Sequence, residues 1–291
     1  NLLRSANVED KLSSAAQKRM RAAFDEIKTL EFTVENIHAF LRGLVESQGE
    51  IFREMACDVF DLITRYHTDN VVFYKGWASN DRHRSCGMRL KKTRFVLPGN
   101  LSYAGSNSLS YEASQRLRDF DKVLSVLDGK SGPEVSIESL FGKQGWEKLS
   151  QGERLSSTYM DIRFYPRAGT IHFFPRSQAL MDKLNMLVGL QRQWLPPQTE
   201  AASEDFMKQY QDADRFDKEL RERIAKSAKR HVYGDNPLRE VFSRDCAHKA
   251  HEAIYAALTD IHASHGIKVD FQLQSKRDEN LAAPQQLLLV A

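Results

Sequence analysis

The residues best suited to bind a ligand form a basic segment between Trp77 and Phe95, flanked by aromatic rings. Arginine and lysine dominate it against a single acid, Asp81. Such clustering can neutralise nucleic-acid phosphates, and an exposed indole can stack on a base. The same composition is typical of a solvated loop, so both interpretations stay open. The contact residues expected for nucleic acid are Trp77, Arg82, Arg84, Arg89, Lys91, Lys92 and Arg94.

A second candidate site lies on an expected β-hairpin over residues 159–174. With residues 166–169 as the loop, the alternation of residue types pairs Arg163 with His172. One face of the hairpin is then apolar and the other is polar and aromatic. Arginines near the start of the following helix favour an anion, because backbone amides also point outward there. The alternative is cross-strand packing around a hydrogen-bonded histidine. The candidate anion-binding residues are Arg163, Arg167, His172 and Arg176.

Metal chemistry is a third possibility. His248 and His251 lie three residues apart on an expected helix, where two imidazoles can approach one ion. Zinc requires further ligands, and Cys246 points more than a quarter-turn away from both histidines. The carboxylates of Asp119 and Asp121 also diverge on a helix, which favours capping and salt bridges over a two-metal site. We therefore expect no metal and no cofactor, and a metal-dependent hydrolase or nuclease ranks last among the alternatives.

Length and composition indicate a globular chain. It has 291 residues, of which 41% are hydrophobic, enough for a core. Lysine and arginine (42) barely exceed aspartate and glutamate (39), so any basic surface must be local. The three cysteines are well separated and fit a reducing compartment. No apolar run approaches the roughly 18 residues of a membrane span. We expect a cytoplasmic protein without a membrane partner. The sequence begins at Asn1 and leaves undecided whether a targeting segment precedes it.

The elements that position these residues predict an α+β fold that is mainly helical. The predicted order is an N-terminal helical hairpin, a small antiparallel sheet covered by helices, and a C-terminal helical extension. A linker-like Leu-Pro-Pro-Gln segment after Trp194 divides the chain into an α+β domain over 1–197 and an extension over 198–291 with a short strand and a flexible tail. The predicted helices cover residues 8–30, 33–66, 111–127, 176–194, 204–231 and 237–264, and residues 136–149 are expected to hold a short helix and a turn.

Two segments carry a resemblance to a known family. The run Leu-Arg-Asp-Phe-Asp-Lys-Val-Leu-Ser-Val-Leu-Asp-Gly-Lys, residues 117–130, resembles a characteristic segment of the bacterial family catalogued as domain of unknown function 4942. The hairpin and helix over residues 161–185 resemble its second signature, although the loop at 166–169 replaces the usual asparagine-glycine turn. The similarity covers roughly residues 30–195. It implies an accessory protein of a prophage, plasmid or genomic island, in a phage-host conflict or anti-restriction setting, with no assigned activity.

These observations favour a non-catalytic, nucleic-acid-associated accessory factor of a mobile element. The alternative is a protein-interaction module that binds a toxin, a methyltransferase or a second copy of itself, as a homo-oligomer. Exposure of the polar hairpin face decides how the two candidate sites relate. If that face is open, Arg163 and His172 join the basic segment in one continuous site, whereas burial makes both residues structural.

Overall fold

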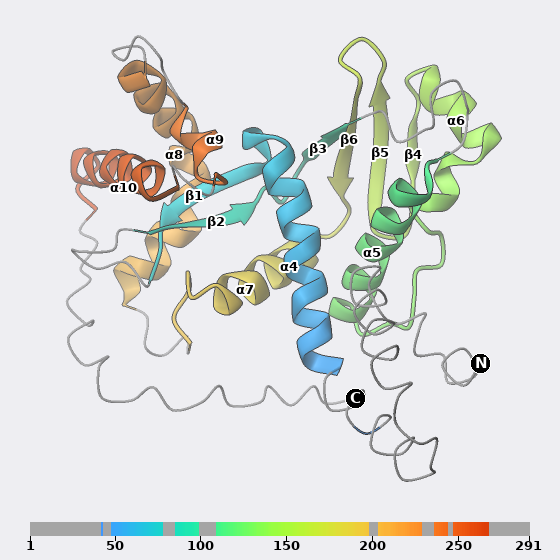
Figure 1. The fold of residues 1–291 in the computed structure, drawn as a ribbon, viewed down its shortest axis with the longest axis horizontal. Helices are drawn as coiled ribbons and strands as arrows, with labels where there is room; N and C mark the ends of the chain where they lie inside the picture. Colours follow the sequence, from blue (N-terminus) through green and yellow to red (C-terminus); the bar gives the residue numbers. More distant parts are fainter. Residues whose placement is uncertain are drawn as a thin grey trace, which may run out of the picture. The chain divides into compact units, whose positions relative to one another are not determined.

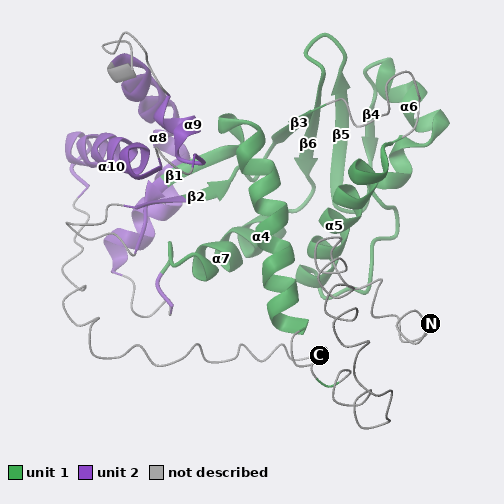
Figure 2. Cartoon of the chain, viewed as in Figure 1, with its two compact units in different colours: residues 1–73, 88–195 green, residues 74–87, 196–291 purple. Residues whose placement is uncertain are grey.

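The chain folds as an α+β protein in two compact units (Figures 1 and 2). The computed structural model describes residues 42, 48–77, 85–98, 109–197, 203–228, 236–243 and 247–267. Unit 1 comprises Asn1–Phe73 and Met88–Leu195, and unit 2 comprises Tyr74–Gly87 and Pro196–Ala291. Unit 1 thus ends at the linker expected after Trp194, while the first part of the basic segment belongs to unit 2.

Unit 1 contains the helices α4 to α7 and a four-stranded antiparallel sheet in the order β3-β6-β5-β4. The predicted helix over 8–30 and the start of the one over 33–66 lie outside the described residues, and so does the helical hairpin. The elements of unit 1 are α4 (Gln48–Tyr66), η2 (Thr68–Asn70), β3 (Phe95–Pro98), α5 (Tyr111–Leu127), η3 (Glu138–Phe141), α6 (Lys143–Ser150), β4 (Arg154–Ser156), β5 (Met160–Tyr165), β6 (Thr170–Pro175) and α7 (Gln178–Gln191).

Helix α5 confirms the predicted bounds of 111–127, and its two ends explain them. The Ser110 hydroxyl accepts a hydrogen bond from the amide of Ala113, which caps the first turn. Gly129 follows the helix with φ of 73°, a left-handed conformation that glycine adopts without steric cost. The cap and the glycine therefore fix the helix locally, independently of its tertiary contacts.

The core of unit 1 lies on one face of the sheet, called the inner face. Phe95 of β3 stacks on Phe173 of β6 with ring centroids 5.1 Å apart, and Phe120 of α5 meets both rings edge-on. Each such buried ring contributes roughly 1.5–3 kcal/mol of burial free energy. Helices α4 and α7 complete the core around Phe95 and Met160 (Figure 1). Their contributing side chains are Val59, Ile63, Met181 and Leu184.

Two buried asparagines tie helices to neighbouring backbone. The Asn70 side chain donates to the carbonyls of Ile63 and Val96 and accepts from the amide of Val96. Asn185 of α7 accepts from the amide of Leu90 and donates to its carbonyl, at 2.8 and 3.0 Å. On the polar side of its predicted amphipathic helix, Asn185 is expected to face water. That expectation is wrong, because its amide side chain completes a strand edge inside the protein.

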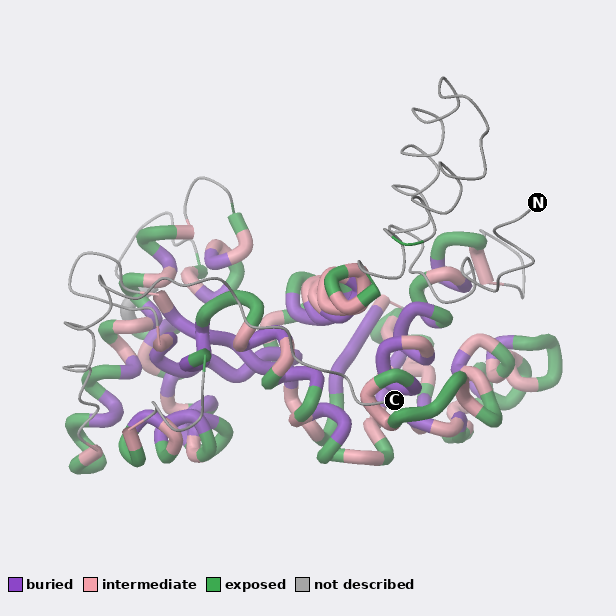
Figure 3. Tube along the Cα trace, turned by 90° about the horizontal axis from the view of Figure 1, so that it is seen from below, coloured by how far each residue is buried: buried purple, intermediate pink, exposed green. Residues whose placement is uncertain are grey.

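Strands β1 (Val71–Lys75) and β2 (Cys86–Leu90) form a two-stranded antiparallel ribbon. The run Val-Val-Phe-Tyr-Lys-Gly-Trp, residues 71–77, predicts β1. The residues of β2 belong to a polar, glycine-containing segment that is expected to separate strands, and that interpretation is wrong. All five residues of each strand are buried, so β2 lacks the alternation that marks a half-exposed strand (Figure 3). Gly87 is required there, since a Cβ atom would lie 2.4 Å from the Tyr74 ring.

The C-terminal part of unit 2 is helical, with α8 (Glu204–Ala228), α9 (Pro237–Glu240) and α10 (Ala247–Ser264). The sequence predicts one helix over 237–264, but α9 ends in a turn at residues 241–242. Helix α10 carries Ile254, Leu258 and Ile261 on its buried side, together with His262. The predicted strand lies, apart from Ile267, outside the described residues. Among the helices described, none has both the length and the apolar character required to cross a bilayer.

Candidate nucleic-acid interface

The β5-β6 hairpin has the register that its sequence predicts. Arg163 lies opposite His172, and Ile162 lies opposite Phe173. In the loop, the amide of Ala168 donates to the carbonyl of Tyr165, and Gly169 has φ of 61°. Because side chains alternate between faces, Ile162 and Phe173 point into the core while Arg163 and His172 lie on the opposite side.

That opposite side, called the outer face, is open on unit 1. The described helices of this unit pack on the inner face, where Trp146 of α6 meets Phe164 with centroids 5.3 Å apart. Arg94, Arg154 and Arg163 are exposed, and the aromatic side chains beside them are half-buried. By register the outer face includes Val96, Pro98, Ser156 and Thr170, of which Val96 is buried. Its charged and aromatic members are Arg94, Arg154, Asp161, Arg163, Tyr165, His172 and Phe174.

Three aromatic rings form a row along the centre of the outer face. The Tyr165 and His172 ring centroids are 4.1 Å apart, and those of His172 and Phe174 are 6.3 Å apart. Arginines flank this row at both ends. The Arg154 guanidinium lies 4.0 Å from the Phe174 centroid, and that of Arg163 lies 5.2 Å from the Tyr165 centroid. The rings at the two ends of the row, Phe174 and Tyr165, therefore each lie beside an arginine guanidinium.

The outer face is positively charged. Asp161 is its one carboxylate, and its oxygens lie 3.3 Å from Arg154 and 3.8 Å from Arg176. Arg94 and Arg163 have no carboxylate within ion-pair distance among the described residues. Partial burial, followed by the charges of Arg94 and Arg163, lowers the pKa of His172 below its ordinary value. His172 is therefore neutral at pH 7, and Arg94 Nη1 lies 3.4 Å from its Nδ1.

Residues 1–194 match the family described as "Domain of unknown function (DUF4942)". The chain belongs to this family. The match includes the whole outer face and ends just before the linker to the C-terminal helices. No curated protein and no solved structure matches the chain.

Within the family domain, the basic segment does not lie on one surface. Arg89 lies on β2 and is 2% exposed, which removes it from any contact surface. Lys92 Nζ lies 3.1 Å from a carboxylate oxygen of Asp182 on α7, and Lys91 is half-buried. Of these three residues, only the lysines retain solvent access.

The two ends of the basic segment also separate. Trp77 belongs to unit 2, where its ring packs edge-on against Phe206 with centroids 5.3 Å apart. Arg82 and Arg84 lie outside the described residues. Arg94, immediately before β3, is the member that pairing between β3 and β6 brings beside His172. The basic segment and the hairpin therefore share a site through Arg94.

The arginines at the hairpin ends do not form one clamp with His172. Arg167 is exposed in the β5-β6 loop, whereas Arg176 follows β6 at the other end of the hairpin. Six residues of strand separate them, which spans about 20 Å. Arg176 donates to the carbonyl of Ser157 at 2.7 Å and also pairs with Asp161. It therefore supports the edge of the outer face, and the predicted four-residue anion site is replaced by the row of rings and arginines.

Sequence reasoning missed Arg154. Strand β4 has three residues, and its pairing places Arg154 opposite Arg163. A three-residue exposed strand shows no periodicity from which its partner can be found. A basic residue a few positions before an aromatic hairpin is the one available signal, and it carries no information on register.

The two candidate metal ligands in unit 2 have different surroundings. His248 is exposed and its Nδ1 lies 3.8 Å from Glu252. His251 is more buried, and its Nδ1 lies 2.9 Å from Cys86 Sγ and accepts from the Cys86 amide at 3.2 Å. Burial lowers the pKa of His251 and raises that of the Cys86 thiol, so both groups are neutral. Within the described ranges, no three His, Cys, Asp or Glu side chains gather as a metal would require.

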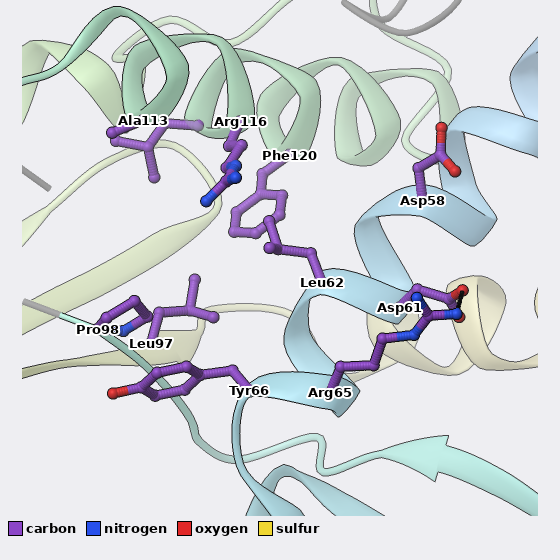
Figure 4. Close-up of a pocket in the computed structure, with 11 residues that line it drawn as sticks. Asp58, Asp61, Leu62, Arg65, Tyr66, Leu97, Pro98, Ala113, Arg116 and Phe120 are labelled. Atoms are coloured by element: carbon purple, nitrogen blue, oxygen red, sulfur yellow. Dashed lines mark hydrogen bonds and ion pairs between the residues drawn. The ribbon is translucent and has the colours of Figure 1, made fainter. Parts of the chain in front are cut away.

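An open groove of about 490 Å³ lies between α4, β3 and α5 in unit 1 (Figure 4). Leu62, Leu97 and Phe120 contribute to its apolar floor. Figure 4 shows Tyr66 of α4 and Arg116 of α5 on opposite sides of it. Its remaining lining residues are Asp58, Asp61, Arg65, Pro98, Ala113 and Leu117.

Proposed function

We propose that this protein is a non-catalytic factor that binds nucleic acid on the outer face of its four-stranded sheet. The observation that carries the proposal is the row of Tyr165, His172 and Phe174 between three exposed arginines, which lie on β4, on β5 and just before β3. The resemblance to accessory proteins of prophages, plasmids and genomic islands supports a cytoplasmic location. Nucleic acid is accessible to a protein in that compartment.

The charge distribution supports phosphate contact. Arg94 directly precedes β3, Arg154 lies on β4 and Arg163 lies on β5. The three side chains therefore form a short positive stripe across the strands. Each phosphate neutralised by such a side chain adds about 0.7–0.9 to the slope of log affinity against log salt. Because Arg154 pairs with Asp161, the two phosphate contacts expected are those of Arg94 and Arg163, which predict a slope of about −1.5.

The test is binding of labelled oligonucleotides by fluorescence anisotropy over a range of salt. The double variant R94Q/R163Q removes the two arginines that have no carboxylate partner. Because two phosphate contacts are lost, we expect the variant to bind more weakly at low salt. The magnitude of its slope of log affinity against log salt should also be smaller by about 1.5. The control R215Q/R239Q removes the same charge from exposed positions on α8 and α9. Equal affinities for parent, test and control variants would refute the proposal.

Self-association is a second candidate function, favoured by the groove between α4 and α5. Its rim carries two aspartates and two arginines around an apolar floor, and this balance suits a twofold interface in which one patch meets its own copy. Tyr66 lies at the rim and is 38% exposed. Its ring is the aromatic side chain expected to insert into the same groove of the partner copy.

Sedimentation velocity over a range of concentrations tests this second function. A dimer that Y66E converts to monomer would support it. A parent protein that remains monomeric at every concentration would remove it.

A further inference from the structure

We infer that the outer face selects single-stranded nucleic acid, with bases stacked on Phe174 and on the Tyr165-His172 pair and phosphates held by the flanking arginines. This inference rests on the proposed function and names its ligand class. Two observations carry it: the half-buried rings are contiguous, and the surface that displays them is a four-stranded sheet.

The shape of the outer face disfavours a duplex. The major groove of B-DNA is about 12 Å wide and admits a helix or a two-stranded ribbon, whereas four strands spaced about 4.8 Å apart exceed it. On a duplex the face would reach phosphates only, and the rings would have no base to contact. A single strand can instead turn its bases toward the sheet, as in other four-stranded nucleic-acid-binding sheets whose aromatic rings stack two or three bases.

The side chains of the outer face are held in positions suited to stacking. Tyr165 and His172 are diagonal neighbours across the hairpin, and their tilted rings overlap with centroids 4.1 Å apart, so they form one stacked pair that a base can extend. Asp161 holds the Arg154 guanidinium over the Phe174 ring, so a base at this position stacks on the guanidinium plane that covers the ring. Guanidinium planes serve as stacking partners for unpaired bases in the same way as aromatic rings. Arg94 and Arg163 remain available for phosphates on either side.

Nucleic acids recognised in this way come from RNA or from unwound DNA. Base stacking does not test for a 2′-hydroxyl, so this surface is expected to accept both backbones. The outer face is therefore expected to distinguish single strands from duplexes. Base composition is expected to affect the affinity less.

The experiment compares oligonucleotides of one mixed sequence as single-stranded DNA, single-stranded RNA and duplex DNA, by anisotropy at low salt. We expect both single strands to bind at least about tenfold more tightly than the duplex. F174L and Y165L keep apolar bulk and remove ring stacking. Each should weaken single-strand binding about 5- to 100-fold, since a base-aromatic stack contributes that much, and leave the salt slope unchanged.

Tyr111 supplies the matched control, because it is 75% exposed at the start of α5 and Y111L alters an aromatic ring outside the outer face. Circular dichroism of each variant verifies folding. Duplex binding as tight as single-strand binding, or unchanged affinity in F174L and Y165L, would overturn the single-strand inference and leave the proposed function standing. Absence of binding to all three oligonucleotides would overturn both.

Discussion

Replacing the buried Asp121 of α5 by asparagine should change the pH dependence of stability. Asp121 is 3% exposed, and its Oδ2 accepts a hydrogen bond of 2.7 Å from the amide of Ile137. Its Oδ1 is buried without a hydrogen-bond partner. Desolvation by burial, with a smaller contribution from the charge of Glu138, raises the pKa of Asp121 to about 7. D121N keeps an acceptor for Ile137 and removes the ionisation.

The sign follows from proton linkage. Between pH 4 and 7 the folded state keeps a proton on Asp121 that the unfolded state, with a pKa of about 3.9, has released. Stability from this group is therefore fully present at low pH and is lost as pH rises toward 7, by about 1.4 kcal/mol per pH unit. The total is about 4 kcal/mol once the carboxyl is ionised in both states.

Urea unfolding at pH 5, 6 and 7 measures this effect. In a W77F background, tryptophan fluorescence reports unit 1, which contains Trp146 and Trp194. The free energy of unfolding of D121N minus that of the parent should increase by about 2.3 kcal/mol from pH 5 to pH 7, because the folded carboxyl is half ionised at pH 7. Histidines that titrate in this range are common to both proteins and cancel in the difference.

The control is D128N, at the half-buried C-cap of the same helix. Lys130, which hydrogen-bonds and pairs with Asp128 at 2.8 Å, lowers the pKa of this carboxyl. The ionised Asp128 carboxylate stabilises the fold, and this contribution is lost only below about pH 4. The free energy of unfolding of D128N minus that of the parent should therefore be constant between pH 5 and 7. A D121N difference that is equally constant would refute the assignment of Asp121 as a neutral buried acid.

Two further variants test the packing of the fold by urea unfolding. N70A removes three buried hydrogen bonds and leaves the amide of Val96 unpaired, so the free energy of unfolding should fall by about 3 kcal/mol; a fall under about 1 kcal/mol would show that these bonds are replaced by water. G87A places a methyl group against the Tyr74 ring and should cost about 1–3 kcal/mol, whereas G132A points into open space and should stay within about 0.5 kcal/mol. Equal effects of the two glycine variants would contradict the described packing of Tyr74.

The local parts of the fold could be predicted from the sequence because each carries its own determinants. The hairpin alternates apolar and polar residues on both sides of a short loop, so one register alone keeps Ile162 and Phe173 in the core. Helix α5 has a serine cap and a terminal glycine. These features depend on neighbours a few residues away, and the sequence contains them directly.

The non-local parts could not be predicted in the same way. Strand β2 is buried on both faces with Arg89 at its fourth position, so neither alternation nor an apolar run marks it. Asn185 is polar and sits within a helix, and its role depends on the backbone of Leu90, 95 residues away. Arg94 joins His172 through a strand pair that no local pattern announces. The composition of the candidate site was therefore partly visible in the sequence, whereas its assembly required the sheet order.

The outer face of the sheet as the nucleic-acid contact surface is most directly tested by photocrosslinking. A single-stranded oligonucleotide with photoreactive uracils is bound at saturation, irradiated, and the crosslinked peptides are identified by mass spectrometry. Crosslinks are expected on β4, β5 and β6, at Arg154, Tyr165, His172 and Phe174. Crosslinks confined to unit 2, with none on these strands, would contradict the account.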